Sequence, residues 1–252
     1  MIGVERHGPV VVLRLDHGKV HALDDVLLGE IVASLDEVED SDARAVVLTA
    51  AGRVFSAGVD LQQVLDGGTD YVERLIPALA SAFVRLFAYP GPVVAAVNGP
   101  AVAGGCILAC ACDRRILVTG GRIGASELLV GVPFPVSALE ILRWACGDRT
   151  EEVVVSGKLY PSDEALEVGM AHEVVDADRL LDRALEVAGD LGALDPAAFR
   201  MAKAQLRRPT IERIASDAPV VDPEVRALWS SVQTTAAIRA QVERMSGRRT
   251  PP

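Results

Sequence analysis

Apolar runs alternate with amphipathic segments along most of the chain, and this order predicts an α/β fold. Short runs dominated by Val, Leu and Ile indicate buried strands at residues 9–16, 45–49, 93–97 and 114–119. Apolar residues at helical spacing predict helices at residues 24–39, 71–87, 104–112 and 137–146. Because strands and helices alternate without a fixed repeat, we expect one layered core rather than a solenoid.

Glycine and proline positions predict where these elements stop. Residues 66–70 read D-G-G-T-D, which is typical of a mobile loop. In the helical C-terminal part, we expect Pro209 to break one helix and Pro223 to open another. We therefore divide the chain into a core of residues 1–190 and a helical region of residues 191–252.

Composition and charge narrow the functional classes. The chain has 252 residues, of which 50% are hydrophobic, and a formal net charge of −10 at pH 7. This charge argues against nucleic acid or an anionic membrane surface as a partner. Residues 5–7 read E-R-H where a signal peptide would be apolar, and no apolar run has the length of a bilayer span. We expect a cytoplasmic protein that holds any anionic ligand with local groups.

The cysteines favour neither a metal site nor disulfides. Cys106, Cys110 and Cys112 fall on the predicted helix 104–112, and Cys146 lies apart from them. The paired C-x-x-C spacing of a zinc site is missing. We predict buried, unmodified thiols and no bound metal.

The central stretch of the chain joins a buried strand to an apolar helix that begins with two glycines. The strand at 93–97 ends in a turn at 98–100, and Gly104 and Gly105 start the helix. The first N–H groups of a helix have no internal partner, and glycine lets a ligand approach them closely. The helix start could hold a polarised carbonyl oxygen or an anion. Tight packing against a neighbouring segment explains the glycines equally well.

Two further segments carry candidate chemistry. The loop at 51–61 has an apolar anchor at Phe55 followed by small residues, so its backbone N–H groups could also face a ligand. Glu127 is the one acid in the otherwise apolar stretch 122–135. It is either a solvated or capping residue, or a carboxylate whose apolar surroundings raise its pKa for proton transfer.

Several ordered motifs together resemble the crotonase superfamily, the enoyl-CoA hydratase/isomerase fold. They read F-S-A-G-V-D-L at 55–61, V-N-G-P-A-V-A-G-G-C at 97–106 and S-E-L-L-V-G-V-P at 126–133. The resemblance implies a spiral of repeated β-β-α units. It also implies that the C-terminal helices at 191–252 form a trimerisation region in a homotrimer or a dimer of trimers.

The resemblance also assigns a site for an acyl-CoA thioester. The backbone N–H groups of Ala57 and Gly104 would form the oxyanion hole that holds the thioester oxygen as it becomes an enolate. Coenzyme A is then part of the substrate and no separate cofactor is needed, as in the acyl-CoA metabolism of fatty-acid β-oxidation. The other implied contacts with the substrate are Lys19, Ala22, Ser56, Gly58, Asp60, Leu61, Gly105, Ile107 and Ser126.

One departure from the family pattern decides between reactions. Hydratases of this family use two carboxylates, one directly after G-G-C and one before L-x-x-G. Here the second is Glu127, but the first position is Ile107, which can neither hold nor ionise a water. A single carboxylate can shift a double bond by moving a proton from C2 to C4. The pattern therefore resembles the Δ3,Δ2-enoyl-CoA isomerases.

Other readings stay open at this point. The protein could be hydratase-like or catalyse another acyl-CoA reaction with an unusual second acid, for which Glu140 is a candidate although a surface position is expected for it. It could also bind acyl-CoA without turnover. Ala103 stands where the family has glycine, which is tolerable if its φ is negative.

Overall fold

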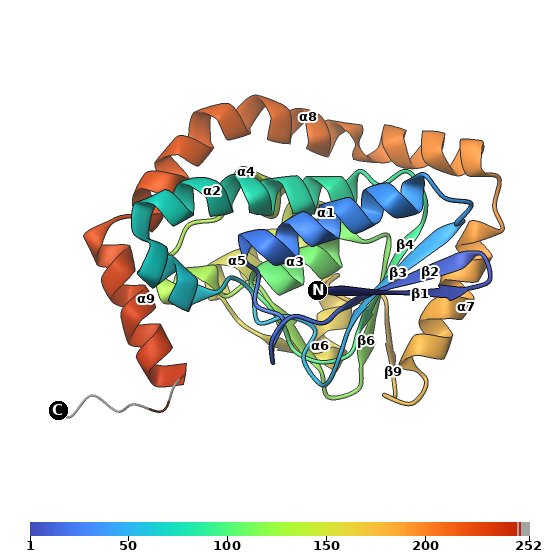
Figure 1. Cartoon of the computed structure of the whole chain (residues 1–252), viewed down its shortest axis with the longest axis horizontal. Helices are drawn as coiled ribbons and strands as arrows, with labels where there is room; N and C mark the ends of the chain where they lie inside the picture. Colours follow the sequence, from blue (N-terminus) through green and yellow to red (C-terminus); the bar gives the residue numbers. More distant parts are fainter. Residues whose placement is uncertain (246, 248–252) are drawn as a thin grey trace.

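The main sheet of the protein is nearly all parallel. The computed structural model describes residues 1–245 and 247, and within them the main sheet has six strands in the order β1-β2-β3-β4-β6-β9 (Figure 1). β1 pairs antiparallel with β2, and every later pair is parallel. The strands are β1 Ile2–His7, β2 Val10–Leu15, β3 Ala45–Ala50, β4 Val93–Val97, β6 Arg114–Val118 and β9 Glu173–Val175. The predicted strands are thus confirmed, and β1 and β9 are added to them.

The central strands are buried on both faces, which explains their uninterrupted apolar sequences. On one face of β2, the side chains of Val11 and Leu13 belong to a core cluster that they share with one layer of helices. Val10 and Val12 point the other way, into a second cluster formed with α7, Leu180–Gly192. Successive strand residues face opposite sides of a sheet, so a sheet covered by helices on both sides needs apolar residues at every position.

A small second sheet and the helices complete the fold. The small sheet contains β5 Ala101–Val102, β7 Arg122–Gly124 and β8 Tyr160–Pro161. The helices of the core are α1 Asp25–Glu39, α2 Leu61–Phe87, α3 Gly104–Ala111, α4 Val136–Cys146, α5 Thr150–Ser156 and α6 Ser162–Glu167, with short 3-10 turns η1 Glu127–Val130 and η2 Gly147–Arg149. After α7 come α8 Pro196–Trp229 and α9 Val232–Met245. α8 runs along α2, and α9 lies at the far end of α2 from the sheet (Figure 1). The predicted boundary after residue 190 falls inside α7.

The predicted loop at residues 66–70 is wrong. These residues belong to α2, whose N-terminus is capped by the Asp60 carboxylate through the N–H groups of Gln62 and Gln63. Gly68 alone has non-helical angles inside α2, with φ 57° and ψ −148°. The D-G-G-T-D sequence therefore produces a bend in a helix rather than a loop.

The predicted helix breaks at Pro209 and Pro223 are also wrong, because α8 continues through both. A proline inside a helix loses one backbone hydrogen bond, and packing of the helix can offset that loss. Lys203, Arg207 and Thr210 recur at helical spacing and are buried, so the packed face of α8 continues across Pro209. The tertiary contacts of α8 outweigh the local effect of its prolines.

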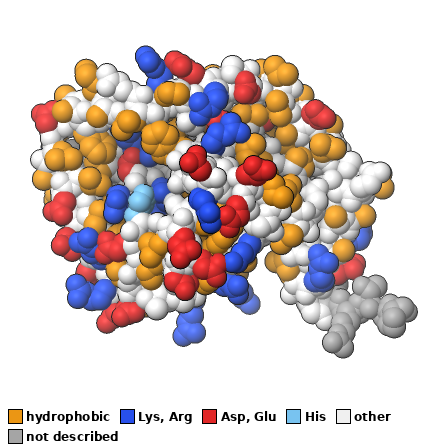
Figure 2. Space-filling view, turned by 180° about the vertical axis from the view of Figure 1, so that it is seen from behind, with side chains coloured by type: hydrophobic (Ala, Val, Ile, Leu, Met, Phe, Trp, Pro, Cys, Tyr) orange, Lys and Arg blue, Asp and Glu red, His pale blue; other side chains and the backbone are white. Residues whose placement is uncertain are grey.

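The surface agrees with the charge balance of the sequence. Figure 2 shows acidic and basic side chains interspersed over one face of the molecule, with no broad field of either sign. Among the described residues, no helix is both long and apolar enough to cross a bilayer. The cytoplasmic location stays a prediction.

Candidate active site

A cavity of about 660 Å³ lies where the loops after β2, β3 and β4 meet. These loops leave the carboxyl ends of parallel strands, the usual edge for ligand binding in α/β folds. Helices close the other sides. The lining residues are Val20, Ala22, Ala57, Val59, Asp60, Leu61, Gln62, Leu79, Phe83, Val102, Ala103, Gly104, Ser126, Glu127, Val130, Val132, Pro135, Ala138, Trp229, Gln241, Val242 and Met245.

Ser56 holds the three loops together. Its hydroxyl donates to the His21 carbonyl at 2.7 Å, and its own carbonyl accepts from the Val102 N–H at 2.9 Å. Gly58, two residues after Ser56, has φ +82°, and a Cβ there would lie 2.8 Å from the Val102 carbonyl oxygen. Ser56 and Gly58, both predicted to contact substrate, instead lie behind the cavity wall and shape it.

The predicted oxyanion donor Ala57 is wrong, because its N–H donates to the Val20 carbonyl at 3.0 Å. Val59 offers the open N–H instead. Val59 pairs with Leu23 in a parallel bridge in which Leu23 bonds to the groups on either side of Val59. The Val59 N–H therefore points away from Leu23 and has no acceptor among the described residues.

Gly104 supplies the second open N–H. It is the first residue of α3, and its N–H has no acceptor in the described part of the chain. The two loops touch at this point, since a Cβ on Gly58 would lie 3.4 Å from the Gly104 nitrogen. Gly105 is a packing glycine instead, because a Cβ on it would lie 2.6 Å from the Ser56 carbonyl oxygen. Val59 and Gly104 thus bring two unpaired donors to one wall of the cavity.

Ala103 sets the direction of Gly104 through a strained backbone. Its φ is +51° and its ψ is −121°, so the condition of a negative φ, under which an alanine would be tolerated here without strain, is not met. Two hydrogen bonds hold it there: its N–H donates to Gly124 and its carbonyl accepts from Ile107. A region of the backbone map that favours glycine is therefore occupied by an alanine next to the open donor.

We expect Ala103→Gly to stabilise the protein by about 1 kcal/mol. Relief of the strained conformation contributes roughly 1–3 kcal/mol, and the greater freedom of glycine in the unfolded chain removes about 0.5–1 kcal/mol of that gain. Urea unfolding followed by circular dichroism measures the difference. A lower midpoint for the variant would show that Ala103 is not strained.

Glu127 begins the short turn η1, which Gly131 ends with φ 72°. The Glu127 side chain is only 7% exposed, and one of its carboxylate oxygens, Oε2, has no hydrogen-bond partner. Burial without a cationic partner raises the pKa of Glu127 to about 8. Glu127 is therefore a carboxyl group placed to exchange a proton near neutral pH.

The raised pKa has a consequence for stability. Between its ordinary pKa of 4.5 and about 8, Glu127 holds its proton more tightly in the folded chain, so the folded state loses stability as pH rises through this window. We expect Glu127→Gln to be about as stable as wild type near pH 4.5 and more stable by roughly 4–5 kcal/mol above pH 8. Urea unfolding of both proteins from pH 5 to 9 measures the gap, and a constant gap would contradict the raised pKa.

The other predicted site residues divide into two groups. The first group lines the cavity and consists of Ala22, Asp60, Leu61 and Ser126, whereas the second, Lys19 and Ile107, does not line it. Lys19 is exposed and does not line it. Ile107 is fully buried in the core behind the cavity wall.

The expected surface position of Glu140 is wrong, because this side chain is buried. It forms ion pairs with Arg213 at 2.6 Å and Arg143 at 2.7 Å, and it does not line the cavity. Among the lining residues the carboxylates are Asp60 and Glu127, and Asp60 caps α2. Glu127 is thus the lining acid whose oxygens are not committed to a helix end.

The structure offers no cluster for a metal within its described residues, where no group of three or more His, Cys, Asp or Glu side chains gathers. The four cysteines are free and buried. The Sγ atoms of Cys106 and Cys110 lie 4.0 Å apart on successive turns of α3.

The fold and the cavity together define a protein of the crotonase fold. The human mitochondrial Δ3,Δ2-enoyl-CoA isomerase matches it with a TM-score of 0.94, at 28% sequence identity over 99% of both chains. A family profile described as "Enoyl-CoA hydratase/isomerase" matches residues 5–243. The chain belongs to the enoyl-CoA hydratase/isomerase family.

Relatives in this family carry names of both activities. The chain is 32% identical to a "Putative enoyl-CoA hydratase" of Thermus thermophilus over 81% of its own length and 82% of the relative's. It is also 32% identical to "Enoyl-CoA delta isomerase 1, mitochondrial" of Homo sapiens, over 82% of its own length and 70% of the relative's. Identity at this level establishes an enzyme of the family. Which of the two reactions the protein catalyses has to be inferred from the residues of the site.

Proposed function

We propose that the protein isomerises 3-enoyl-CoA to trans-2-enoyl-CoA, with Glu127 as the single acid and base. The observation that carries this proposal is the isolation of Glu127, a buried carboxyl group without a charged partner in a mostly apolar cavity. Ile107 fills the core at the position directly after G-G-C, where the resemblance places the other carboxylate of a hydratase. A double-bond shift needs one proton carrier and no water.

The chemistry follows from the two open donors and the acid. The thioester oxygen would accept from the N–H groups of Val59 and Gly104, which stabilise the negative charge that develops when C2 loses its proton. Ionised Glu127 takes that proton, and the C–H electron pair passes into the thioester to give a dienolate, which on protonation at C4 re-forms the carbonyl and leaves the double bond between C2 and C3. Glu127 then returns the proton to C4. The proton lost from C2 is thus the proton gained by C4, and the Glu127 carboxylate is regenerated.

Hydration of a 2-enoyl-CoA is the second candidate, favoured by the hydratase names among the relatives. It requires a second group that holds the water. Glu140 is occupied by two arginines, and the Asp60 carboxylate accepts from two backbone N–H groups at the start of α2. Neither side chain is free for this role. Acyl-CoA binding without turnover is a third outcome of the assay.

The deciding experiment gives the purified protein 3-octenoyl-CoA and trans-2-octenoyl-CoA in separate reactions. Absorbance of the conjugated thioester and product masses are followed. Isomerisation predicts conjugation from the first substrate and no gain of water by the second. Hydration of the second substrate would overturn the proposal, and binding without any product would indicate a non-catalytic protein.

We further propose a homotrimer or a dimer of trimers as the assembled form. Apolar side chains are exposed along the outer faces of α8 and α9, among them Met201, Leu206, Val220, Leu228 and Val232. Several large apolar side chains exposed on neighbouring helices are typical of a surface that another subunit covers. Light scattering after gel filtration measures the mass, and a monomer at micromolar concentration would contradict this assembly.

A further inference from the structure

A second cavity lies between the C-terminal end of α2 and the first half of α8. It shares no lining residue with the cavity that contains Glu127, Val59 and Gly104, which we call the catalytic cavity. Its volume is about 380 Å³, which is within the range of small-molecule sites. Its apolar walls are formed by Phe87, Ala88, Pro90, Ala204 and Ile211. Its charged lining residues are Arg200, Lys203, Arg207 and Arg208, and no acidic residue lines it in the described chain. Four cationic side chains thus meet at one cavity of a protein whose net charge is −10.

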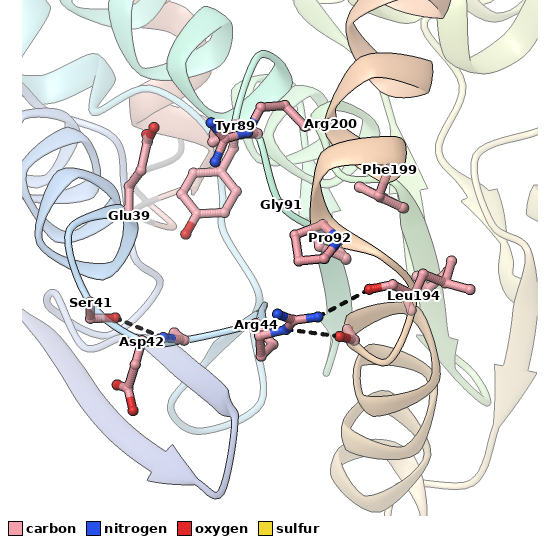
Figure 3. A pocket seen from close by; sticks show the side chains of 15 residues that line it. Glu39, Ser41, Asp42, Arg44, Tyr89, Gly91, Pro92, Leu194, Phe199 and Arg200 are labelled. Carbon is pink, nitrogen blue, oxygen red and sulfur yellow. Dashed lines mark hydrogen bonds between the residues drawn. The ribbon is translucent and has the colours of Figure 1, made fainter.

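This cationic cavity continues into a neighbouring one of about 370 Å³, with which it shares Tyr89, Pro90 and Arg200. Figure 3 shows the Arg200 side chain reaching from α8 toward Tyr89. The acids that line the neighbouring cavity are already paired, Glu39 with Arg85 at 2.6 Å and Asp42 with Arg6. Arg200 has no ion-pair partner among the described residues, so nothing local neutralises it.

The deep end of the cationic cavity contains two buried cations and one carboxylate. Lys203 Nζ lies 2.7 Å from Asp113 Oδ2, and an Arg207 guanidinium nitrogen lies 2.8 Å from Asp113 Oδ1. Lys203 and Arg207 are 7% and 4% exposed. Two positive charges against one negative charge leave an excess of one. Carbonyls at the ends of α2 and α3 accept from Arg207 and offset part of this excess.

Donors remain for a ligand in this cluster. The ammonium group of Lys203 has three N–H donors, and the structure gives two of them partners, the Gly91 carbonyl and Asp113. The Nε–H of Arg207 has no acceptor among the described residues. Burial lowers the pKa of Lys203 to about 8 despite its contact with Asp113. A buried charge that is only partly compensated is stabilised by an added anion.

We propose that the cationic cavity binds an aliphatic monocarboxylate, chemically a free fatty acid. One negative charge matches the single positive excess at Lys203 and Arg207. The hydrocarbon tail matches the walls that Phe87, Pro90 and Ile211 form. Arg200 stands unpaired at the exposed rim, and Arg208 beside it lies 3.7 Å from Glu212 in a solvent-exposed ion pair, so both can attract the anion. This site is independent of the proposed isomerase reaction, because it shares no lining residue with the catalytic cavity.

Calorimetric titration of the full-length protein with decanoate tests the proposal. We expect saturable binding of decanoate, and binding at least tenfold weaker for decanol, which lacks the charge, and for acetate, which lacks the tail. The double variant Arg200→Ala/Arg208→Ala should raise the Kd of decanoate about tenfold. Both side chains are exposed, so the variant should fold normally.

Two single variants separate this site from the catalytic cavity. Ala204→Phe places a ring in the cationic cavity and should weaken decanoate binding at least tenfold. Ala138→Leu fills the catalytic cavity and should leave the Kd of decanoate unchanged. The proposal is overturned if decanoate does not saturate, if decanol binds equally well, or if Ala138→Leu rather than Ala204→Phe removes binding.

Discussion

Replacing Glu127 with Gln is expected to lower kcat for 3-enoyl-CoA isomerisation by about 10³-fold or more. General acid and base catalysis contributes about 10²–10⁴-fold, and here one carboxylate performs both transfers. Gln has the same shape and cannot accept the proton, so the Kd of a saturated acyl-CoA should change less than threefold. Steady-state kinetics and calorimetry measure the two quantities separately.

The wild-type enzyme should also show the titration of this base. Because only ionised Glu127 can take the proton from C2, kcat/KM should rise with pH and level off above about pH 8. Glu140→Gln is the matched control, since Glu140 is a buried acid outside the cavity. If Glu140→Gln lost as much activity as Glu127→Gln, a second acid would have to take part in the reaction.

Much of the fold follows from local patterns of the sequence. The strands β2, β3, β4 and β6 are predicted because both faces of the sheet are covered, which produces unbroken apolar runs. The position of α3 is predicted because two glycines follow a strand and a turn. In each case the local sequence and the tertiary environment favour the same structure.

The errors arise where tertiary contacts decide. Pro209 has the local properties of a helix breaker, but buried residues on both sides of it keep α8 helical across this position. Gly67 and Gly68 resemble loop residues, and a capped and packed helix absorbs them as a bend. Strong packing of a long amphipathic segment overrides such single-residue preferences.

The oxyanion donor shows a limit of another kind. A motif such as A-G-V-D indicates a loop with accessible N–H groups, but it does not show which way each group points. That direction depends on pairing with Leu23, a residue of a different loop. The pairing turns the Val59 N–H toward the cavity, while the Ala57 N–H donates to the Val20 carbonyl. An unpaired donor can be identified only after every hydrogen bond around it is known.

Asp113→Ala is expected to destabilise the protein by about 3–5 kcal/mol, the largest loss of stability that we predict. The Asp113 carboxylate accepts from the backbone N–H of Val93 in β4 and pairs with Lys203 and Arg207 in α8. Its removal leaves two buried cations with no carboxylate and frees one end of the sheet strand. Breaking a buried ion pair by deleting one partner typically costs about this much.

Urea unfolding at pH 7 measures the loss, with Asp195→Ala as the control. Asp195 is also an acid attached to α8, but it is exposed and only caps the helix through the Ala198 N–H. Loss of a cap costs about 1 kcal/mol. If both variants lost the same stability, the cluster around Asp113 would contribute no more than a helix cap. A larger loss in Asp113→Ala, partly recovered by 10 mM decanoate, would mean that a carboxylate ligand can replace the missing charge.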